Sequence, residues 1–502
     1  MPERLVPGTP RADIVQRLGA PTGVYPLRDG TRLQYSRQPA GPQVYNLDLD
    51  ALGEALIYQR QLAADKKRIV VIGLSEKHEH ERAEIERLIA SFAPDEFHFI
   101  PEGTAIPWEQ FRDAVVLVKA HRDRAFEYEV ARGKALKHRT IVEINLSAIK
   151  HNVGFYRSRL PKGVRILAMV KASSYGSGAE KVAPYLQHTG ITDFGVAFAD
   201  EGIALKTNGI QTPIMVLNPE ISSFEAIIQH QLEPEIYSFN GLFHFLEVLK
   251  EKNLTHYPIH LKIDTGMHRL GFQEHDLPKL LLILKNNDSV KIQSILSHLA
   301  ASEDLQQQTF TKKQIQLFDQ LSCKISEELH IKPLRHLVNS SGIHHYPEAQ
   351  FDMVRLGIGL YGIENIASVQ HKLQRVGTLK SVISQIRTIA PGESVGYGRR
   401  FMADKTTKIA TIPIGYADGI RRSWGNEVGY VVINGKEAKI VGSVCMDMLM
   451  VNVTEIDCKE GQSVIIFGEN PTVNLMAKAL NTIPYEILTG ISQRVKRVFF
   501  RE

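Results

Sequence analysis

The feature that most constrains the fold is a series of eight short apolar segments, each followed by a polar or helix-favouring stretch. The segments are 166–171, 193–198, 213–218, 233–238, 259–264, 292–298, 334–339 and 351–357. Eight β-α repeats in roughly 230 residues come close to the ~250 residues typical of a (β/α)8 barrel. We therefore predict this α/β fold for residues 138–373, although periodicity alone also allows a doubly wound sheet.

The segment before the barrel, residues 1–137, alternates strand-like and helix-like patterns. Strands are expected at 68–74, 96–100 and 114–119, and helices at 48–62, 76–90 and 125–137. This alternation predicts a small α/β domain with a mostly parallel sheet.

The segment after the barrel, residues 374–502, loses the helical pattern. β-Branched runs occur at 408–414, 429–433, 439–444 and 463–467. Turn pairs such as Pro391-Gly392 and Asn434-Gly435 lie between them. We predict a C-terminal β-domain.

Composition excludes several classes of function. The chain has 60 basic and 55 acidic residues and no basic block, which argues against a nucleic-acid or membrane partner. Three widely spaced cysteines suggest neither a disulfide framework nor a metal site. The first residues lack the apolar core of a signal peptide, and no apolar run is long enough to span a membrane. We expect a cytoplasmic protein that acts on a small molecule.

Lys171 is the first candidate functional residue. It ends the first predicted strand, and barrel enzymes build their active sites at the carboxyl ends of the strands. A lysine there can form a Schiff base with an aldehyde cofactor, and the Gly/Ser-rich turn 173–178 lets the backbone approach a phosphate. The alternative is a solvated lysine before a flexible turn.

Other polar residues follow the later strands at the same end of the predicted barrel. They are Lys262, Asp264, Arg269, His298, Asn339, Ser340 and Arg355. Each has an ordinary structural explanation by itself, but core packing gives no reason for all of them to gather at one end. We therefore predict a ligand site there.

Two motifs are interpreted as structural. The spacing Gly-x-Gly-x-x-Gly at 357–362 lacks the helix and acidic residue of a dinucleotide site, so we predict a turn that closes the barrel. His78-Glu79-His80 lacks zinc-protease spacing and is interpreted as a solvated helix face.

The run Val170 to Gly178, VKASSYGSG, resembles the signature of alanine racemases. Further matching motifs, in family order over about 141–500, are 262–271, 338–340, 353–358, 395–398, 415–419 and 444–447. The resemblance implies an isomerase that uses pyridoxal 5'-phosphate to interconvert L-alanine and D-alanine for peptidoglycan synthesis.

The resemblance also implies residue roles. Lys171 would carry the cofactor and act as the base on one face of the substrate Cα, with Tyr397 as the base on the other face. A racemase needs two such groups, because a single base returns the proton mostly to the face it came from. Arg355 would pair with the pyridine nitrogen and, because it stays protonated, leave that nitrogen without its own proton.

The remaining roles concern the cofactor and the substrate. The implied cofactor contacts are Tyr175, His298, Asn339, Ser340 and the backbone of Gly357 and Ile358. The implied substrate contacts are Arg269, Tyr416 and Met446, with Lys262 at a position that is often carbamylated. Tyr397, Tyr416 and Met446 would come from the partner subunit, which implies a homodimer with shared active sites.

The sequence departs from the family pattern at three positions. Ser173 and Ser177 replace the usual Asn and His of the first motif, and Gln493 replaces a tyrosine that helps to hold the phosphate. These changes concern cofactor affinity and leave Lys171 and Tyr397 in place.

The N-terminal segment resembles, more weakly, the C-terminal domain of the Mur ligase that adds D-alanyl-D-alanine to muramoyl-tripeptide. The matching segments are 45–52 and 116–120. No Gly-x-x-x-x-Gly-Lys-Ser/Thr loop occurs, and an ATP-binding domain has no room before Tyr45. The segment is interpreted as a remnant without ligase activity, acting as a folded spacer or docking domain.

Three alternatives stay open at this point. The chain could be a racemase of broader amino-acid specificity, a non-catalytic pyridoxal-phosphate-binding protein, or a decarboxylase on a similar barrel. Tyr397 and the β-domain argue against the second, because such carriers resemble the barrel alone. Arg355 argues against the third, because those enzymes place an acidic residue at the ring nitrogen.

Overall fold

The computed structural model describes residues 23–27, 30–34, 56, 67–73, 82–100, 114–120 and 139–501. The chain divides into two compact units, one up to Arg139 and the other Thr140–Arg501. In the described part of the chain, no helix is long and apolar enough to cross a membrane.

The first unit contains a three-stranded parallel sheet in the order β4 (Glu96–Ile100), β3 (Lys67–Gly73), β5 (Ala114–Ala120). Helix α3 (Arg82–Ser91) packs Ile85 and Ile89 into the same core as Val70 and Ile72. Strands β1 (Gly23–Leu27) and β2 (Gly30–Gln34) form an antiparallel pair. The parallel strands confirm the predicted pattern, whereas the segments 45–52, 78–80 and 125–137 lie outside the described residues.

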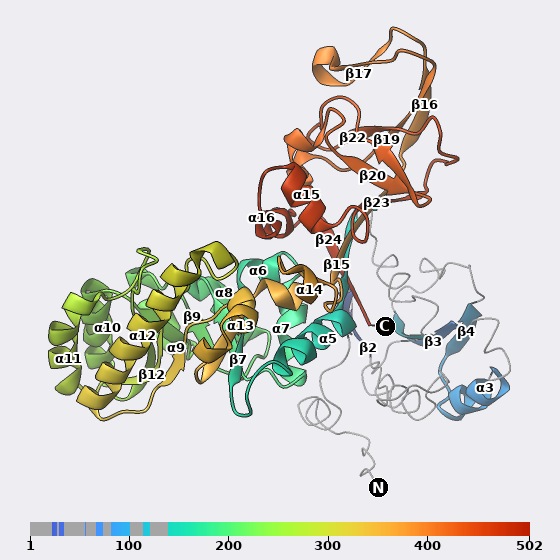
Figure 1. The fold of residues 1–502 in the computed structure, drawn as a ribbon. Helices are drawn as coiled ribbons and strands as arrows, with labels where there is room; N and C mark the ends of the chain where they lie inside the picture. Colours follow the sequence, from blue (N-terminus) through green and yellow to red (C-terminus); the bar gives the residue numbers. More distant parts are fainter. Residues whose placement is uncertain are drawn as a thin grey trace. The chain divides into compact units, whose positions relative to one another are not determined.

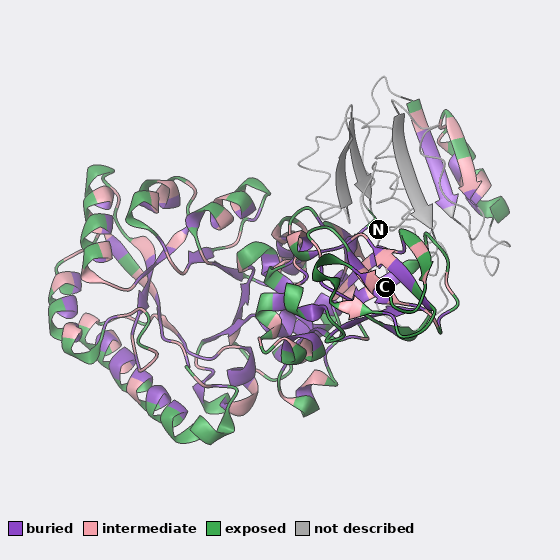
Figure 2. Cartoon of the chain, turned by 90° about the horizontal axis from the view of Figure 1, so that it is seen from above, coloured by how far each residue is buried: buried purple, intermediate pink, exposed green. Residues whose placement is uncertain are grey.

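The second unit contains the predicted barrel. Its strands are β7 (Arg165–Met169), β8 (Asp193–Val196), β9 (Ile214–Val216), β10 (Glu233–Ile236), β11 (Tyr257–Lys262), β12 (Val290–Leu296), β13 (Leu334–His336) and β14 (Met353–Leu356). The paired strands run parallel in chain order, and β14 returns to pair with β7. The Arg355 amide donates to the Val338 carbonyl at 3.0 Å and links β14 to the β13 segment. All eight predicted strands are confirmed, and Figure 2 shows them as a ring with helices outside.

The barrel helices bury one face each. Helix α12 (Gln308–Leu329) turns Ile315, Phe318, Leu321 and Ile325 inward, at the spacing of an amphipathic helix. Its other face is largely exposed, as the green outer surfaces in Figure 2 show for the ring as a whole. The core is therefore sealed from the side, and access to the barrel is from its ends.

The C-terminal part is a β-domain, coloured orange to red in Figure 1. A six-stranded sheet has the order β21 (Lys436–Lys439), β20 (Tyr430–Ile433), β23 (Ser463–Phe467), β15 (Gly377–Val382), β6 (Ile141–Asn145), β24 (Lys496–Phe500). A second sheet has the order β16 (Gln385–Ile389), β19 (Thr407–Ile412), β22 (Leu449–Asn452). The predicted fold class is confirmed, with one addition: β6, which precedes the barrel in the chain, pairs with β15 and β24.

One predicted strand, 439–444, is wrong. The strand that follows β20 is β21, which ends where the prediction begins. Asn434 and Gly435 both have positive φ, and they form a two-residue turn that pairs Ile433 directly with Lys436. The apolar run after Lys439 forms only an isolated bridge at Ile440, and its side chains are buried.

Candidate functional site

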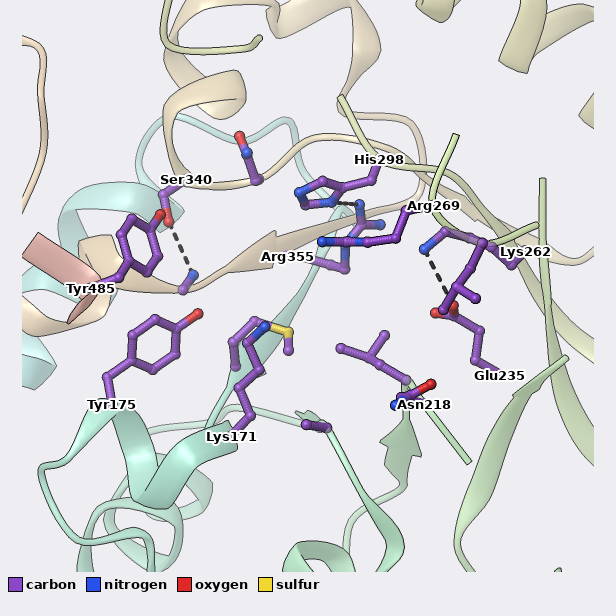
Figure 3. Close-up of a pocket in the computed structure, with 16 residues that line it drawn as sticks. Lys171, Tyr175, Asn218, Glu235, Lys262, Arg269, His298, Ser340, Arg355 and Tyr485 are labelled. Atoms are coloured by element: carbon purple, nitrogen blue, oxygen red, sulfur yellow. Dashed lines mark hydrogen bonds and ion pairs between the residues drawn. The ribbon is translucent and has the colours of Figure 1, made fainter. Parts of the chain in front are cut away.

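A cavity of about 490 Å³ contains most of the predicted site residues (Figure 3). The predicted residues that line it are Lys171, Tyr175, Lys262, Arg269, His298, Asn339, Ser340, Arg355 and Gly357. The sequence did not single out Met169, Ala197, Leu217, Asn218, Glu235, Leu270 and Tyr485, which also line it. The volume is that of a small-molecule site.

Lys171 lies just beyond the first barrel strand rather than at its end. Strand β7 ends at Met169, and Lys171 begins the short helix α6 (Lys171–Tyr175). The next residues, 172–175, all have φ near +50°, a left-handed conformation that costs roughly 1–2 kcal/mol per residue. This turn brings both Lys171 and Tyr175 to the cavity.

The Lys171 amine is available for reaction. It forms no hydrogen bond or ion pair with any described residue, and Figure 3 shows its side chain extending into the cavity. Burial, followed by the charge of Arg269, lowers its pKa. A larger fraction of the amine is therefore unprotonated near neutral pH, which is the form that attacks an aldehyde.

Neutral hydroxyl and amide donors gather at one end of the cavity. The Gly357 amide donates to Ser340 Oγ at 3.0 Å. A Cβ at Gly357 would lie 2.6 Å from the Tyr175 hydroxyl oxygen, so only glycine fits there. The Tyr485 ring lies 5.8 Å from the Tyr175 ring, and Figure 3 shows both hydroxyls near Ser340. This cluster suits a phosphate, which accepts several hydrogen bonds.

Asn339 and Asp264 have structural partners. Asn339 Oδ1 accepts from the Gly342 amide at 3.0 Å and caps the helix α13 (Ser340–His345), which holds Ser340 in place. Asp264 does not line the cavity, and its carboxylate accepts from the backbone amides of Gly266 and His268.

Arg355 is held rigidly in the barrel interior. Its Nη1 donates to His336 Nδ1 at 3.0 Å, and its Nη2 donates to the Ser297 carbonyl at 2.6 Å and to His298 Nδ1 at 3.0 Å. Burial lowers the pKa of Arg355 to about 10, so the guanidinium stays charged at neutral pH. Because arginine can only donate, Nδ1 of His298 accepts. Burial and Arg355 hold the pKa of His298 well below its usual range, and His298 is neutral.

Glu235 is the functional residue that the sequence missed most clearly. Its carboxylate lies 3.3 Å from the Lys262 amine, and both side chains are buried. Glu235 lies near the carboxyl end of β10. The signal in the sequence that could have identified it is an acidic residue inside an apolar strand segment. Burial lowers the pKa of Lys262, and the Glu235 carboxylate opposes that change.

The charge balance of the cavity favours an anionic ligand. Lys171, Lys262, Arg269 and Arg355 face one lining carboxylate, Glu235. Arg269 makes no ion pair with the residues that the structure describes. A phosphate at the Ser340 end and a carboxylate near Arg269 would balance these charges. With the free amine of Lys171 and the fixed cation of Arg355, the residues fit pyridoxal phosphate.

Besides Asp264, four predicted site residues lie outside the cavity. Ile358 follows Gly357 in the chain, is buried, and begins the 3-10 helix η8 (Ile358–Tyr361). This short helical turn confirms the structural interpretation of 357–362. Tyr397, Tyr416 and Met446 are 72%, 44% and 53% exposed and do not line the cavity. The structure therefore does not bring Tyr397 to Lys171 within one protomer.

Comparisons with known proteins agree with this site. Residues 144–365 match the family model of the alanine racemase N-terminal domain, and residues 376–499 match that of the C-terminal domain. The chain is 34% identical to the alanine racemase of Geobacter sp. (strain M21) and 36% identical to that of Clostridium tetani. Each match covers 72% of this chain, and 98% and 95% of the respective relative.

Solved structures give the same result. The alanine racemase of Clostridium difficile 630 matches with a TM-score of 0.69 at 34% identity, over 72% of this chain and 96% of that one. The alanine racemase of Bartonella henselae, solved with covalently bound pyridoxal phosphate, matches with a TM-score of 0.66 at 32% identity, over 72% of this chain and 99% of that one. This chain belongs to the alanine racemase family.

Proposed function

We propose that this protein is an alanine racemase that uses pyridoxal 5'-phosphate to interconvert L-alanine and D-alanine and so supplies D-alanine for peptidoglycan. The observation that carries the proposal is the free Lys171 amine in a cationic cavity, between the neutral donors around Ser340 and the fixed guanidinium of Arg355. Lys171 would hold the cofactor, with Ser340, Tyr175 and Gly357 at its phosphate and Arg355 at its ring nitrogen.

The chain's own residues define the proton transfers. When bound, pyridoxal phosphate supplies an electron sink for the electron pair left at Cα. Lys171 takes or returns the Cα proton on one face of the substrate, and Tyr397 does so on the other. Arg269 orients the substrate carboxylate. Arg355 keeps its proton, so the ring nitrogen stays unprotonated and the sink is weakened, which limits side reactions.

The second base requires a second copy of the chain. Tyr397 begins the 3-10 helix η9 (Tyr397–Arg399), and Tyr416 begins η10 (Tyr416–Asp418). The amides of Tyr416 and Ala417 donate to the carbonyls of Cys445 and Met446, so the loops of Tyr416 and Met446 pack together. Exposed aromatic and methionine side chains outside their own cavity support a homodimer in which each protomer completes its partner's site.

An assay of the purified protein with L-alanine and pyridoxal phosphate tests the function. D-alanine is measured by coupling to D-amino-acid oxidase, and we expect turnover in both directions at comparable rates. L-serine and other small L-amino acids, assayed in parallel, distinguish an alanine racemase from one of broader specificity. Stable binding of the cofactor without any D-alanine would contradict the proposal and favour a carrier protein.

Tyr485 is expected to strengthen cofactor binding. Its ring reaches the phosphate end of the cavity, whereas Gln493 is exposed and does not line it. A hydrogen bond to a charged group contributes about 1.5–3 kcal/mol, so Tyr485→Phe should weaken pyridoxal phosphate binding about 10- to 100-fold. Titration of the apoprotein measures this change. Tyr430→Phe, in the β-domain, is the matched control, and equal affinity of both variants would refute the role.

Three further points remain proposals. The N-terminal unit is a spacer or docking domain without ligase activity, a view supported by its weak resemblance and by the missing phosphate-binding loop. Carbamylation of Lys262 stays a prediction. It requires an unprotonated amine, which burial favours by lowering the pKa of Lys262 and which the adjacent Glu235 carboxylate opposes. A cytoplasmic location also stays a prediction.

A further inference from the structure

A continuous row of polar side chains runs from Arg355 through the barrel interior to Glu233, and all of them are buried except Glu233, which is partly buried. Arg355 Nη1 lies 3.0 Å from His336 Nδ1, and His336 Nε2 lies 2.8 Å from Ser294 Oγ. Ser294 Oγ lies 2.7 Å from His260 Nδ1, and His260 Nε2 lies 2.9 Å from Glu233 Oε2. The five residues come from β14, β13, β12, β11 and β10, which are neighbours around the barrel.

With one proton on each imidazole ring, the chemistry of the end groups fixes the direction of every hydrogen bond. A guanidinium only donates, so His336 Nδ1 accepts and a neutral His336 carries its proton on Nε2. His336 Nε2 therefore donates a hydrogen bond to Ser294 Oγ, and the Ser294 hydroxyl donates to His260 Nδ1. His260 donates from Nε2 to the Glu233 carboxylate, which only accepts. All four hydrogen bonds therefore point from the cation to the anion.

The row of hydrogen bonds also helps to stabilise the buried positive charge of Arg355. Arg355 is a buried cation, and no carboxylate forms an ion pair with it in the described part of the chain. Burying an uncompensated charge is costly, and a series of aligned hydrogen bonds in a low dielectric strengthens each member. Although burial raises the pKa of Glu233, its hydrogen bond from His260 keeps that pKa below the ordinary value, so the far end of the row is anionic.

We propose that Glu233, His260 and Ser294 form a positioning relay that fixes the tautomer of His336 and, through it, the orientation of Arg355 at the cofactor ring. The proposal goes beyond the residues assigned above, and it depends on the proposed function for the position of the ring. None of the three lines the cavity, so each acts through His336 rather than by contact with a ligand.

Two variants test the relay. Ser294→Ala breaks it in the middle, and Glu233→Gln removes the terminal charge while a carbonyl oxygen can still accept from His260. We expect Ser294→Ala to lower kcat about tenfold with little change in KM, because the variant loses one hydrogen bond of a charged network. Glu233→Gln should lower kcat by a smaller factor. The absorbance of the bound cofactor, followed against pH without substrate, should shift in both variants.

The control is Ser322→Ala, another fully buried serine, which lies on α12 and donates to the Asp319 carbonyl. It should leave kcat and the pH profile of the absorbance unchanged. A loss of thermal stability in Ser294→Ala and Glu233→Gln with wild-type absorbance profiles would overturn the relay, because it would indicate a purely structural role. The absorbance readout needs no turnover, so it separates failure of the relay from failure of the racemase proposal.

Discussion

Replacing Lys171 by alanine is expected to abolish racemisation, by about 10⁴-fold or more, since the change removes both the attachment point of the cofactor and one of the two bases. The other lysine of the cavity does not replace it. The Lys262 amine is engaged in an ion pair with the buried carboxylate of Glu235, whereas the Lys171 amine has no such partner among the described residues. Coupled D-alanine detection measures the loss, and the cofactor absorbance after gel filtration should disappear with it.

The matched control for this variant is Lys291→Ala. Lys291 is exposed and lies at the start of β12, at the opposite end of the barrel from the cavity. It should retain wild-type turnover and cofactor. If Lys171→Ala kept a tenth of the activity or bound the cofactor as firmly as the wild type, Lys171 would not be the residue that carries it.

The sequence predicted the barrel and most of its cavity for one physical reason. Parallel strands with alternating helices place their carboxyl ends on one side, so polar residues that follow strands far apart in the chain converge. Lys171, Arg269, His298 and Arg355 meet in this way. The left-handed turn after Lys171 was not predicted, because small and polar residues such as Ala172 and Ser173 do not usually adopt it.

The sequence could not predict contacts set by pairing between distant segments. Glu235 faces Lys262 because β10 and β11 are neighbours, with Ile236 opposite Leu261. Tyr485 reaches the cavity from the short helix α16 (Pro484–Thr489) in the C-terminal part. Strand β6 joins β24 from the other end of the unit, a register that no local pattern records.

Replacing Tyr397 by phenylalanine should have the second largest effect, a loss of about 10²- to 10⁴-fold in racemisation, because the phenolic proton carrier disappears while the ring remains. Cofactor binding should be unchanged, since Lys171, Ser340 and Arg355, which are proposed to hold the cofactor, are all retained. This combination separates Tyr397 from Lys171, whose loss removes both activity and cofactor. Tyr237→Phe, a barrel tyrosine that does not line the cavity, is the control.

Mixing the two inactive variants tests whether the site is shared between protomers. If Tyr397 acts in the partner's site, a dimer of one Lys171→Ala chain and one Tyr397→Phe chain has one site with both native residues and one with neither. Random assortment makes about half of the dimers mixed, so co-expression should restore about a quarter of wild-type activity. If Tyr397 instead served its own protomer, both sites of a mixed dimer would lack one base, and the mixture would stay inactive. Restored activity would therefore establish the dimer as the catalytic unit, because neither chain alone supplies a complete pair of bases.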